Sequence, residues 1–454
     1  MQLPPRFVER IREQLGAEEA ERLCEALESE QPTSVRLHPL RGALSGWSEA
    51  EPIPWSEAGR YLAARPSFTL DPAFHGGAYY VQEASSQFVG RLLPADCTGM
   101  RILDLCAAPG GKTTLYASRV GAAGLVVANE IDRKRVQVLA DNVRKWGLGN
   151  VAVTCGDAAM AARMEGWYDV VAVDAPCSGE GMFRKDDEAR GEWSEQHVRL
   201  CAERQDAILE DAWRALRAGG TLIYSTCTFN CEEDEGALER FLEQFSEEVE
   251  AADEVAVEPA WGIVTGRVGA FQTFRFMPHR AKGEGFFAAV ARKSEEAAKG
   301  RLPKAKRSVI GAVDKVGATE LKRWLQAPER MQWGMAGETC YVWYKEQAEA
   351  VKRLSEQVSV IYSGVAMGQL FKGKLKPDQA LAHFVGLNRE AVSVAALSRE
   401  EALGYLRRQE VAVERFSEGM NLVVCEELPL GFAKRIGARV NNLYPNVLRI
   451  LKND

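Results

Sequence analysis

Short apolar runs alternate with amphipathic segments between residues 101 and 226, and this rhythm limits the possible folds more than any other feature. The runs are RILDLC (101–106), LVVANE (125–130), VAVTC (151–155), DVVAVDAP (169–176) and TLIYST (221–226). Runs of this length with turn residues at both ends are typical of strands buried on both faces of a parallel sheet. Amphipathic segments lie between them, for example residues 133–147, which end on Gly147. The pattern predicts a doubly wound, Rossmann-like α/β domain.

The chain has 454 residues, which is too long for a single domain. We expect a small N-terminal α+β region over residues 1–75 and the sheet domain over residues 76–294. A polar segment rich in lysine and alanine, residues 294–308, is predicted to be a linker. An α+β domain over residues 305–370 and a last domain over residues 371–454 are expected to follow.

Composition excludes several classes of protein. With 46% hydrophobic and 27% charged residues the chain is typical of globular proteins. It contains no apolar run of the roughly 18–20 residues that a membrane span needs, and its start (MQLPPRFVERIREQL) indicates an amphipathic helix and no export signal. We therefore expect a cytoplasmic protein without a membrane partner. The ten cysteines are scattered, no pair of CxxC motifs occurs, and five histidines are present, so no metal site is expected.

Charge is distributed unevenly along the chain. The net charge is −7, but residues 301–454 carry 24 Lys+Arg against 17 Asp+Glu, a net of +7 that leaves −14 for residues 1–300. A basic C-terminal part suggests contact with a polyanion. Solvated helix faces would give the same excess, so charge alone does not decide.

The first predicted strand leads into a glycine-rich turn, DLCAAPGGKTT (104–114). Small residues let the backbone approach a ligand, and the helix start that follows favours a carboxylate or phosphate. The spacing fits neither GxGxxG nor GxxxxGK[ST]. Glu130 ends the second strand, where a carboxylate could bind both hydroxyls of a ribose. Asp157 follows the third strand and could accept from an adenine amine, and Asp174 ends the fourth. Each acid alone could be an ordinary surface residue, but together they favour S-adenosylmethionine over NAD.

Two cysteines follow successive predicted strands, Cys177 in DAPCSGEGMFRK and Cys227 in YSTCTFNCEEDE. Adjacent parallel strands lie about 5 Å apart, so both thiols could face one pocket beside the cofactor. C5 of cytosine becomes nucleophilic only when a group adds to C6, and a thiolate can add there and leave again. Asp174 is a candidate for stabilising the charge that develops at N3. Packing remains open for either thiol, and the residues alone do not rank them.

The other cysteines near these strands are predicted to have no chemical role. Packing or loop positions are assigned to Cys106, Cys155 and Cys201. Cys231 is expected to open the helix CEEDEGALERFLEQF, with Asn230 as its cap and Glu233 completing a capping box.

With these residues in hand, the chain resembles the Sun/Fmu-type RNA cytosine-C5 methyltransferases, in particular the bacterial RsmF-like branch that acts on ribosomal RNA. Six segments carry the resemblance in the family's order: YYVQEASS (79–86), DLCAAPGGKTT (104–114), NEIDRKR (129–135), DAPCSGEGMFRK (174–185), YSTCTFNCEEDE (224–235) and GEGFFAAVARK (283–293). The resemblance implies that Cys227 attacks C6 while Cys177 assists release of the product. It also implies that S-adenosylmethionine contacts Cys106, Ala107, Ala108, Pro109, Gly110, Gly111, Lys112, Glu130, Asp157 and Asp174.

The resemblance further implies an RNA-recognition-like N-terminal region and a PUA-like RNA-binding tail that includes residues 429–445. RNA is the expected partner, most simply ribosomal RNA or the small ribosomal subunit, and the chain is expected to act as a monomer. A transfer RNA substrate and a non-catalytic ribosome assembly factor are the alternatives. The target cytosine has to be unpaired or flipped out of its stack. Candidate phosphate contacts are Arg184, Lys185, Lys434, Arg435 and Arg439, all of which could equally be solvated surface cations.

Overall fold

A mixed sheet forms the centre of the computed structural model, which describes residues 2–304 and 310–452. Within these residues the sheet has ten strands in the order β11-β12-β13-β9-β8-β5-β6-β7-β16, with β10 paired to β13. The predicted apolar runs supply its parallel part: β5 (Arg101–Leu105), β6 (Leu125–Glu130), β7 (Val151–Cys155), β8 (Tyr168–Asp174) and β9 (Leu216–Thr226). Antiparallel strands extend it beyond β9: β13 (Phe286–Lys293), β12 (Phe271–Phe276), β11 (Val264–Val268) and β10 (Val249–Glu250). The predicted Rossmann-like fold is confirmed.

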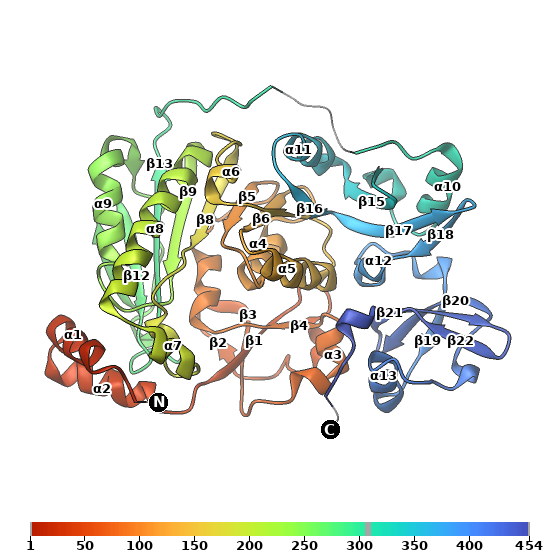
Figure 1. Cartoon of the computed structure of the whole chain (residues 1–454), viewed down its shortest axis with the longest axis horizontal. Helices are drawn as coiled ribbons and strands as arrows, with labels where there is room; N and C mark the ends of the chain where they lie inside the picture. Colours follow the sequence, from red (N-terminus) through yellow and green to blue (C-terminus); the bar gives the residue numbers. More distant parts are fainter. Residues whose placement is uncertain (1, 305–309, 453–454) are drawn as a thin grey trace.

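Helices cover both faces of this sheet (Figure 1). They are α4 (Gly111–Val120), α5 (Arg133–Trp146), α8 (Glu195–Ala215) and α9 (Glu235–Phe245), with the one-turn α6 (Ala158–Ala161) after β7. Successive strand residues point to opposite faces, so Ile102 packs with α4 and α5 while Leu103 packs with α8 and α9. Helix α5 begins where the Asp132 side chain accepts two backbone N–H groups, and it ends on Gly147 in the left-handed conformation, as predicted.

The N-terminal region is a pair of helices followed by a small sheet. Its elements are α1 (Pro5–Leu15), α2 (Ala17–Leu27), β1 (Thr33–Leu37), β2 (Pro52–Ile53), β3 (Ser56–Leu62), α3 (Pro72–His75) and β4 (Tyr79–Val81), with the strands in the order β2-β3-β1-β4. Figure 1 shows the two helices beside α7 (Asp187–Glu192), which follows β8. Phe7 of α1 meets Phe183 and Trp193 there, at ring-centroid distances of 5.0 and 6.0 Å. The N-terminal helices therefore support the loop that follows β8.

The residues after the linker form two further sheets (Figure 1). One has the order β14-β15-β17-β18, and the other has the order β19-β20-β21-β22. The elements are α10 (Lys315–Arg323), β14 (Met331–Ala336), β15 (Thr339–Tyr344), α11 (Lys345–Ser355), β16 (Val360–Ser363), β17 (Val365–Phe371), β18 (Lys374–Pro377), α12 (Gln379–His383), β19 (Ser393–Ala396), α13 (Arg399–Leu406), β20 (Gly419–Cys425), β21 (Leu428–Ile436) and β22 (Arg439–Asn442).

Strand β16 pairs antiparallel with β7 and so belongs to the central sheet. This pairing satisfies backbone groups that an edge strand would leave open. Tyr362 of β16 is 3% exposed, and the guanidinium of Arg144 in α5 lies 4.9 Å from the centre of its ring. The part of the chain after the linker is thus packed on the central sheet.

The predicted domain limits stay predictions, but hydrogen-bonded sheets cross two of them. Strand β4 lies after residue 75 and pairs with β1, and the β17–β18 hairpin spans residue 370. In the predicted linker, residues 294–304 form no helix or strand, and 305–309 lie outside the described residues. No helix in the described chain has the length and apolar character to cross a membrane.

We expect Tyr362→Ala to lower the free energy of unfolding by on the order of 3 kcal/mol, because it removes a buried ring between β16 and α5. Ile361→Ala on the same strand is the matched control, since Ile361 is 37% exposed. Denaturant unfolding followed by fluorescence measures both. Equal losses of unfolding free energy in the two variants would contradict the packing of β16 on the central sheet.

Candidate active site

The loops after β8 and β9 bring two thiols together. The strands pair in parallel with Asp174 opposite Ser225, so both loops leave the same edge of the sheet. The sulfurs of Cys177 and Cys227 are 3.2 Å apart, and the backbone N–H of Cys227 donates to the Cys177 sulfur at 3.4 Å. Neither cysteine is in a disulfide. The two thiols therefore form one pair at the carboxyl end of the sheet.

A lysine from the glycine-rich turn lies beside this pair. The Lys112 ammonium is 2.8 Å from Asp174 Oδ1, and Ser225 Oγ donates to the same oxygen at 2.9 Å. Burial lowers the pKa of Lys112, but the Asp174 carboxylate more than offsets this, so the net shift is upward. The ion pair thus places the buried ammonium of Lys112 and the carboxylate of Asp174 beside the two thiols.

The two thiols have different acidities. The pKa of Cys227 is lowered because the Cys177 thiol hydrogen-bonds to its sulfur, and the charges of Lys112 and Lys185 act in the same direction against burial. The pKa of Cys177 is raised well above the usual range, because its hydrogen is held by that bond and because it is buried. Of the two thiols, Cys227 therefore loses its proton more readily, and the thiolate is the nucleophilic form of a cysteine.

A cavity of 390 Å³ opens in front of the pair. Cys227, Lys112 and Asp174 line it, together with the turn residues 106–109 and Phe286. The Lys112 ammonium lies 5.2 Å from the centre of the Phe286 ring. The cavity thus joins the thiol, the ion pair and an aromatic wall in one space.

A buried glutamate joins the two cysteine loops. Glu180, in the loop after β8, is 1% exposed. Its carboxylate accepts from the Thr228 hydroxyl at 2.8 Å, from the Phe229 backbone N–H at 3.0 Å and from the Trp193 indole at 2.9 Å. Two of these donors follow Cys227 directly, so Glu180 fixes the position of that loop.

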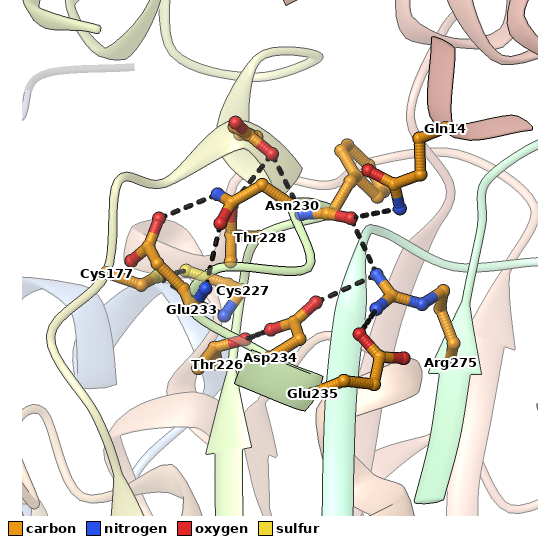
Figure 2. Close-up of polar contacts among 12 residues, drawn as sticks. Gln14, Cys177, Thr226, Cys227, Thr228, Asn230, Glu233, Asp234, Glu235 and Arg275 are labelled. Atoms are coloured by element: carbon orange, nitrogen blue, oxygen red, sulfur yellow. Dashed lines mark hydrogen bonds and ion pairs between the residues drawn. The ribbon is translucent and has the colours of Figure 1, made fainter. Parts of the chain in front are cut away.

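Two more buried carboxylates, Glu233 and Asp234, hold the same loops (Figure 2). Glu233 accepts from the Ser178 backbone N–H at 2.9 Å and from the Asn230 amide at 2.7 Å. Asp234 accepts from the Thr226 hydroxyl at 2.6 Å and from Arg275 at 2.8 Å. The strand end and both loops are therefore fixed by hydrogen bonds to buried acids, each of which is strong where water is excluded.

The predicted helix start at Cys231 is wrong. Helix α9 begins at Glu235, and residues 231–234 form a turn. Asn230 and Glu233 form only half of the predicted capping box. The Glu233 N–H donates to Asn230 Oδ1 at 2.9 Å, and the Glu233 carboxylate accepts from the Asn230 side-chain amide at 2.7 Å. That pair closes the turn after Cys227, and Cys231 is exposed. The carboxylates that would have begun a helix are used instead to hold the cysteine loop.

The glycine-rich turn has a backbone that few side chains tolerate. Cys106 and Gly110 have φ values of 59° and 105°. Helix α4 then starts after Gly110 without a side-chain cap, which leaves its first N–H groups able to bind a carboxylate. The pKa of the Cys106 thiol is raised to about 12, mainly by burial, so this thiol is not a nucleophile.

The residues at the ends of β6 and β7 fit a bound nucleoside. Glu130 is 1% exposed, and its Oε2 has no hydrogen-bond partner in the described chain, with Arg135 3.6 Å away. A buried carboxylate oxygen without a donor suits a ribose hydroxyl. Asp157 caps the one-turn helix α6 through Oδ1 and is exposed. S-adenosylmethionine therefore fits the site, with the α4 start for its carboxylate and Glu130 for its ribose.

Sequence reasoning missed a support from the N-terminal sheet. Arg36 of β1 is 3% exposed and donates to Thr114 Oγ1 at 2.6 Å and to the Gly111 carbonyl at 3.1 Å. The Arg36 side chain also donates to Gln82 Oε1 at 2.7 Å, and the Arg36 guanidinium lies 4.6 Å from the centre of the Trp146 ring. Arg36 thus anchors the start of α4. No local pattern marks it, since it is one arginine in an apolar strand.

The candidate phosphate contacts fall into two groups. The predicted phosphate contact of Arg184 is corrected by the structure. Arg184 pairs with the buried Glu284 at 3.1 Å and donates to the Gly283 carbonyl, so its charge is used inside the protein. Arg435 donates to the Phe416 carbonyl at 2.7 Å. The remaining candidates are exposed: Lys185 at the rim of the active-site cavity, and Lys434 and Arg439 on the last sheet.

We expect Glu180→Ala to lower the free energy of unfolding by roughly 3 kcal/mol and to reduce kcat, because it leaves the Phe229 N–H and the Trp193 indole without an acceptor and removes one acceptor of the Thr228 hydroxyl. Glu180→Gln keeps one acceptor oxygen and should lose less. Glu188→Ala is the control, since Glu188 is exposed on α7. The measurements are denaturant unfolding and methyl transfer. Equal stability and equal activity of the Glu180 and Glu188 variants would show that Glu180 does not fix the position of the loop after Cys227.

Comparison with known proteins places the chain in a family. Sequence models match residues 92–292 (16S rRNA methyltransferase RsmB/F), 3–84 (N-terminal domain of 16S rRNA methyltransferase RsmF) and 392–450 (methyltransferase RsmF PUA domain). The chain is 31% identical to ribosomal RNA small subunit methyltransferase F of Erwinia tasmaniensis over 98% of this chain and 96% of that protein. It is 33% identical to the protein of the same name from Klebsiella pneumoniae, over 89% and 85%.

A solved structure of a methyltransferase homologue from Pyrococcus horikoshii is also similar, with 28% identity and a TM-score of 0.53 over 63% of this chain and 94% of that one. The family models cover the N-terminal region, the catalytic sheet and the last sheet in turn. The chain therefore belongs to the RsmB/F family, in its RsmF branch, and is an S-adenosylmethionine-dependent RNA methyltransferase.

Proposed function

We propose that the protein methylates C5 of a cytosine in small-subunit ribosomal RNA, with Cys227 as the nucleophile. The observation that carries this proposal is the 3.2 Å contact between Cys177 and Cys227 beside the cofactor turn. The names of the relatives, ribosomal RNA small subunit methyltransferase F, support the ribosomal substrate. A role without catalysis would not explain why both thiols are held in one site, and the names of the relatives favour ribosomal RNA over transfer RNA.

The chemistry follows from what an unactivated cytosine lacks. The Cys227 thiolate adds to C6, which moves electron density to C5 and onto the ring nitrogen N3. When bound, S-adenosylmethionine supplies the methyl group that C5 takes up. Water then takes the C5 proton as a base. The electron pair of that C–H bond restores the C5–C6 double bond, the bond between sulfur and C6 breaks, and Cys227 leaves as the thiolate. Cys177 is assigned to this release step, because its sulfur is adjacent to that of Cys227.

Asp174 and Lys112 act on the ring as a pair. Negative charge that develops at N3 needs a nearby positive charge or proton. The ammonium of Lys112, held 2.8 Å from Asp174, supplies positive charge at the cavity wall, and Asp174 orients it. A free carboxylate oxygen of Asp174 can also accept from the exocyclic amine of cytosine, which a uracil lacks.

The cofactor and the target base are held by different parts of the site. We assign the cofactor to the turn residues 106–112 with Glu130, Asp157 and Asp174, and the base to the cavity that Cys227 lines. The base has to leave its stack to reach a thiol at this depth. One chain supplies all of these groups, so we propose that a monomer acts on RNA in the cytoplasm.

We expect Cys227→Ala to abolish methyl transfer, because burial raises the pKa of Cys106, the other thiol that lines the cavity, to about 12. Cys177→Ala should instead accumulate a covalent adduct between protein and RNA, because addition proceeds and release does not. Labelled methyl transfer to 16S ribosomal RNA and denaturing gels measure both. Full activity of Cys227→Ala, or no adduct with Cys177→Ala, would show that the two roles are misassigned.

Lys112→Gln should raise the pKa of Cys227, because a positive charge near the thiolate is lost. Thiolate-dependent alkylation of Cys227 by iodoacetamide increases as pH rises through that pKa. Half-maximal alkylation of the wild type should therefore occur at a lower pH than for an ordinary cysteine. In Lys112→Gln it should occur at a higher pH than in the wild type. Lys345→Gln, on exposed α11, is the control. Mass spectrometry of the alkylated peptide gives the curves, and an unmoved curve in Lys112→Gln would rule out the charge effect.

A further inference from the structure

A second cavity, of 520 Å³, lies next to the active-site cavity. Both are lined by Tyr80, Val81 and Pro109, so the two cavities are adjacent. A third cavity, of 530 Å³, shares Phe74 and Lys145 with the second. The three cavities thus lie in succession from Cys227 to the C-terminal segment 444–448. We call the second and third cavities the flanking groove.

The flanking groove combines aromatic rings with cations. Its first part is lined by Phe68, Phe74 and Tyr80 and by three basic side chains, Arg65, Lys145 and Lys452. No carboxylate is among the residues that line this first part, although the chain as a whole has a net charge of −7. Rings that can stack on bases, interleaved with cations that can meet phosphates, are what single-stranded nucleic acid requires.

The three cations have no acidic partner in the part of the chain that the structure describes. None of them has a carboxylate oxygen within 4.0 Å. The charge of Asp141 acts on Lys145, but this carboxylate is paired with Arg144 at 2.6 Å. Burial lowers the pKa of Lys145 to about 8, and an anionic ligand would offset this desolvation. Lys452 donates to the Ser67 hydroxyl at 3.1 Å, which joins the end of the described chain to the groove.

The aromatic wall is built before any ligand binds. Phe68 packs on Phe74 and Tyr79 at ring-centroid distances of 6.4 and 6.0 Å, and the Lys145 ammonium lies 3.7 Å from the centre of the Phe74 ring. The Tyr80 hydroxyl donates to the Pro109 carbonyl at 3.1 Å, next to the cofactor turn. A wall fixed in this way loses little conformational freedom on binding.

We propose that the flanking groove binds the nucleotides next to the target cytosine, with bases against Phe68 and Tyr80 and phosphates at Arg65, Lys145 and Lys452. The inference rests on the proposed function, because an RNA strand must enter the site. The groove leads the strand away from Cys227 and toward the C-terminal domain. It holds the neighbours of the flipped base while that base occupies the active-site cavity.

The test uses the full chain and a short single-stranded RNA from the target region of 16S ribosomal RNA, with 4-thiouridine next to the cytosine. Phe68→Leu keeps apolar packing and removes the ring, and it should weaken binding about tenfold. Lys145→Gln should weaken binding and lower the slope of log affinity against log salt by about 1. Ultraviolet crosslinks should fall on peptides that contain residues 65–69 or 142–145.

Matched controls are available elsewhere on the surface. Phe371→Leu changes a ring that is 70% exposed on the β17–β18 hairpin, and Lys352→Gln changes an exposed lysine of α11. Both should bind as the wild type does, and thermal melts check that all variants fold. Wild-type affinity in both groove variants, or crosslinks confined to other peptides, would overturn the groove. A wild-type chain that binds this RNA through the groove but transfers no methyl group counts against the proposed function alone.

Discussion

The parallel pairing of β8 with β9 is the constraint on which the site depends. It sets Asp174 opposite Ser225, and the two loops that follow then carry Cys177 and Cys227 to within 3.2 Å of each other. A shift of one residue in this register would turn the side chains at the strand ends to the other face. The lowered pKa of Cys227 follows from this alignment, and Lys112 reaches Asp174 because β5, which precedes it, pairs with β8 on the other side.

The loops keep this geometry because buried acids hold them. Glu180 connects the loop after β8 to the residues after Cys227, and Asp234 connects the end of β9 to Arg275. Burying a carboxylate is unfavourable unless its oxygens are hydrogen-bonded. The resulting network is rigid, and a catalytic pair needs to be held to within fractions of an ångström. The N-terminal region adds to it through Arg36 and through Gln14, which donates to the Phe229 carbonyl at 2.8 Å (Figure 2).

Much of the central fold could be predicted, since each strand of the parallel sheet is a local apolar run and α5 carries its own cap and its own terminal glycine. Prediction failed where the role of a residue depends on contacts with residues that are distant in the sequence. Glu233 and Asp234 look like the start of a helix but serve the cysteine loop. Arg184 looks like a surface cation but pairs with Glu284, a hundred residues away along the chain. The place of β16 in the central sheet was also not predictable, because a four-residue strand carries no sign of its partner.

The sequence by itself determined the chemistry that this protein can attempt: two thiols at successive strand ends, a glycine-rich turn and acids suited to a nucleoside. These are local patterns, and residue type and spacing are enough to reveal them. Only the tertiary structure decided which of the two thiols has the lowered pKa, which lysine lies beside it and which basic side chains are paired inside the protein. The acidity of a thiol and the pairing of a basic side chain depend on burial and on the charges that folding brings near. Local sequence patterns reveal neither.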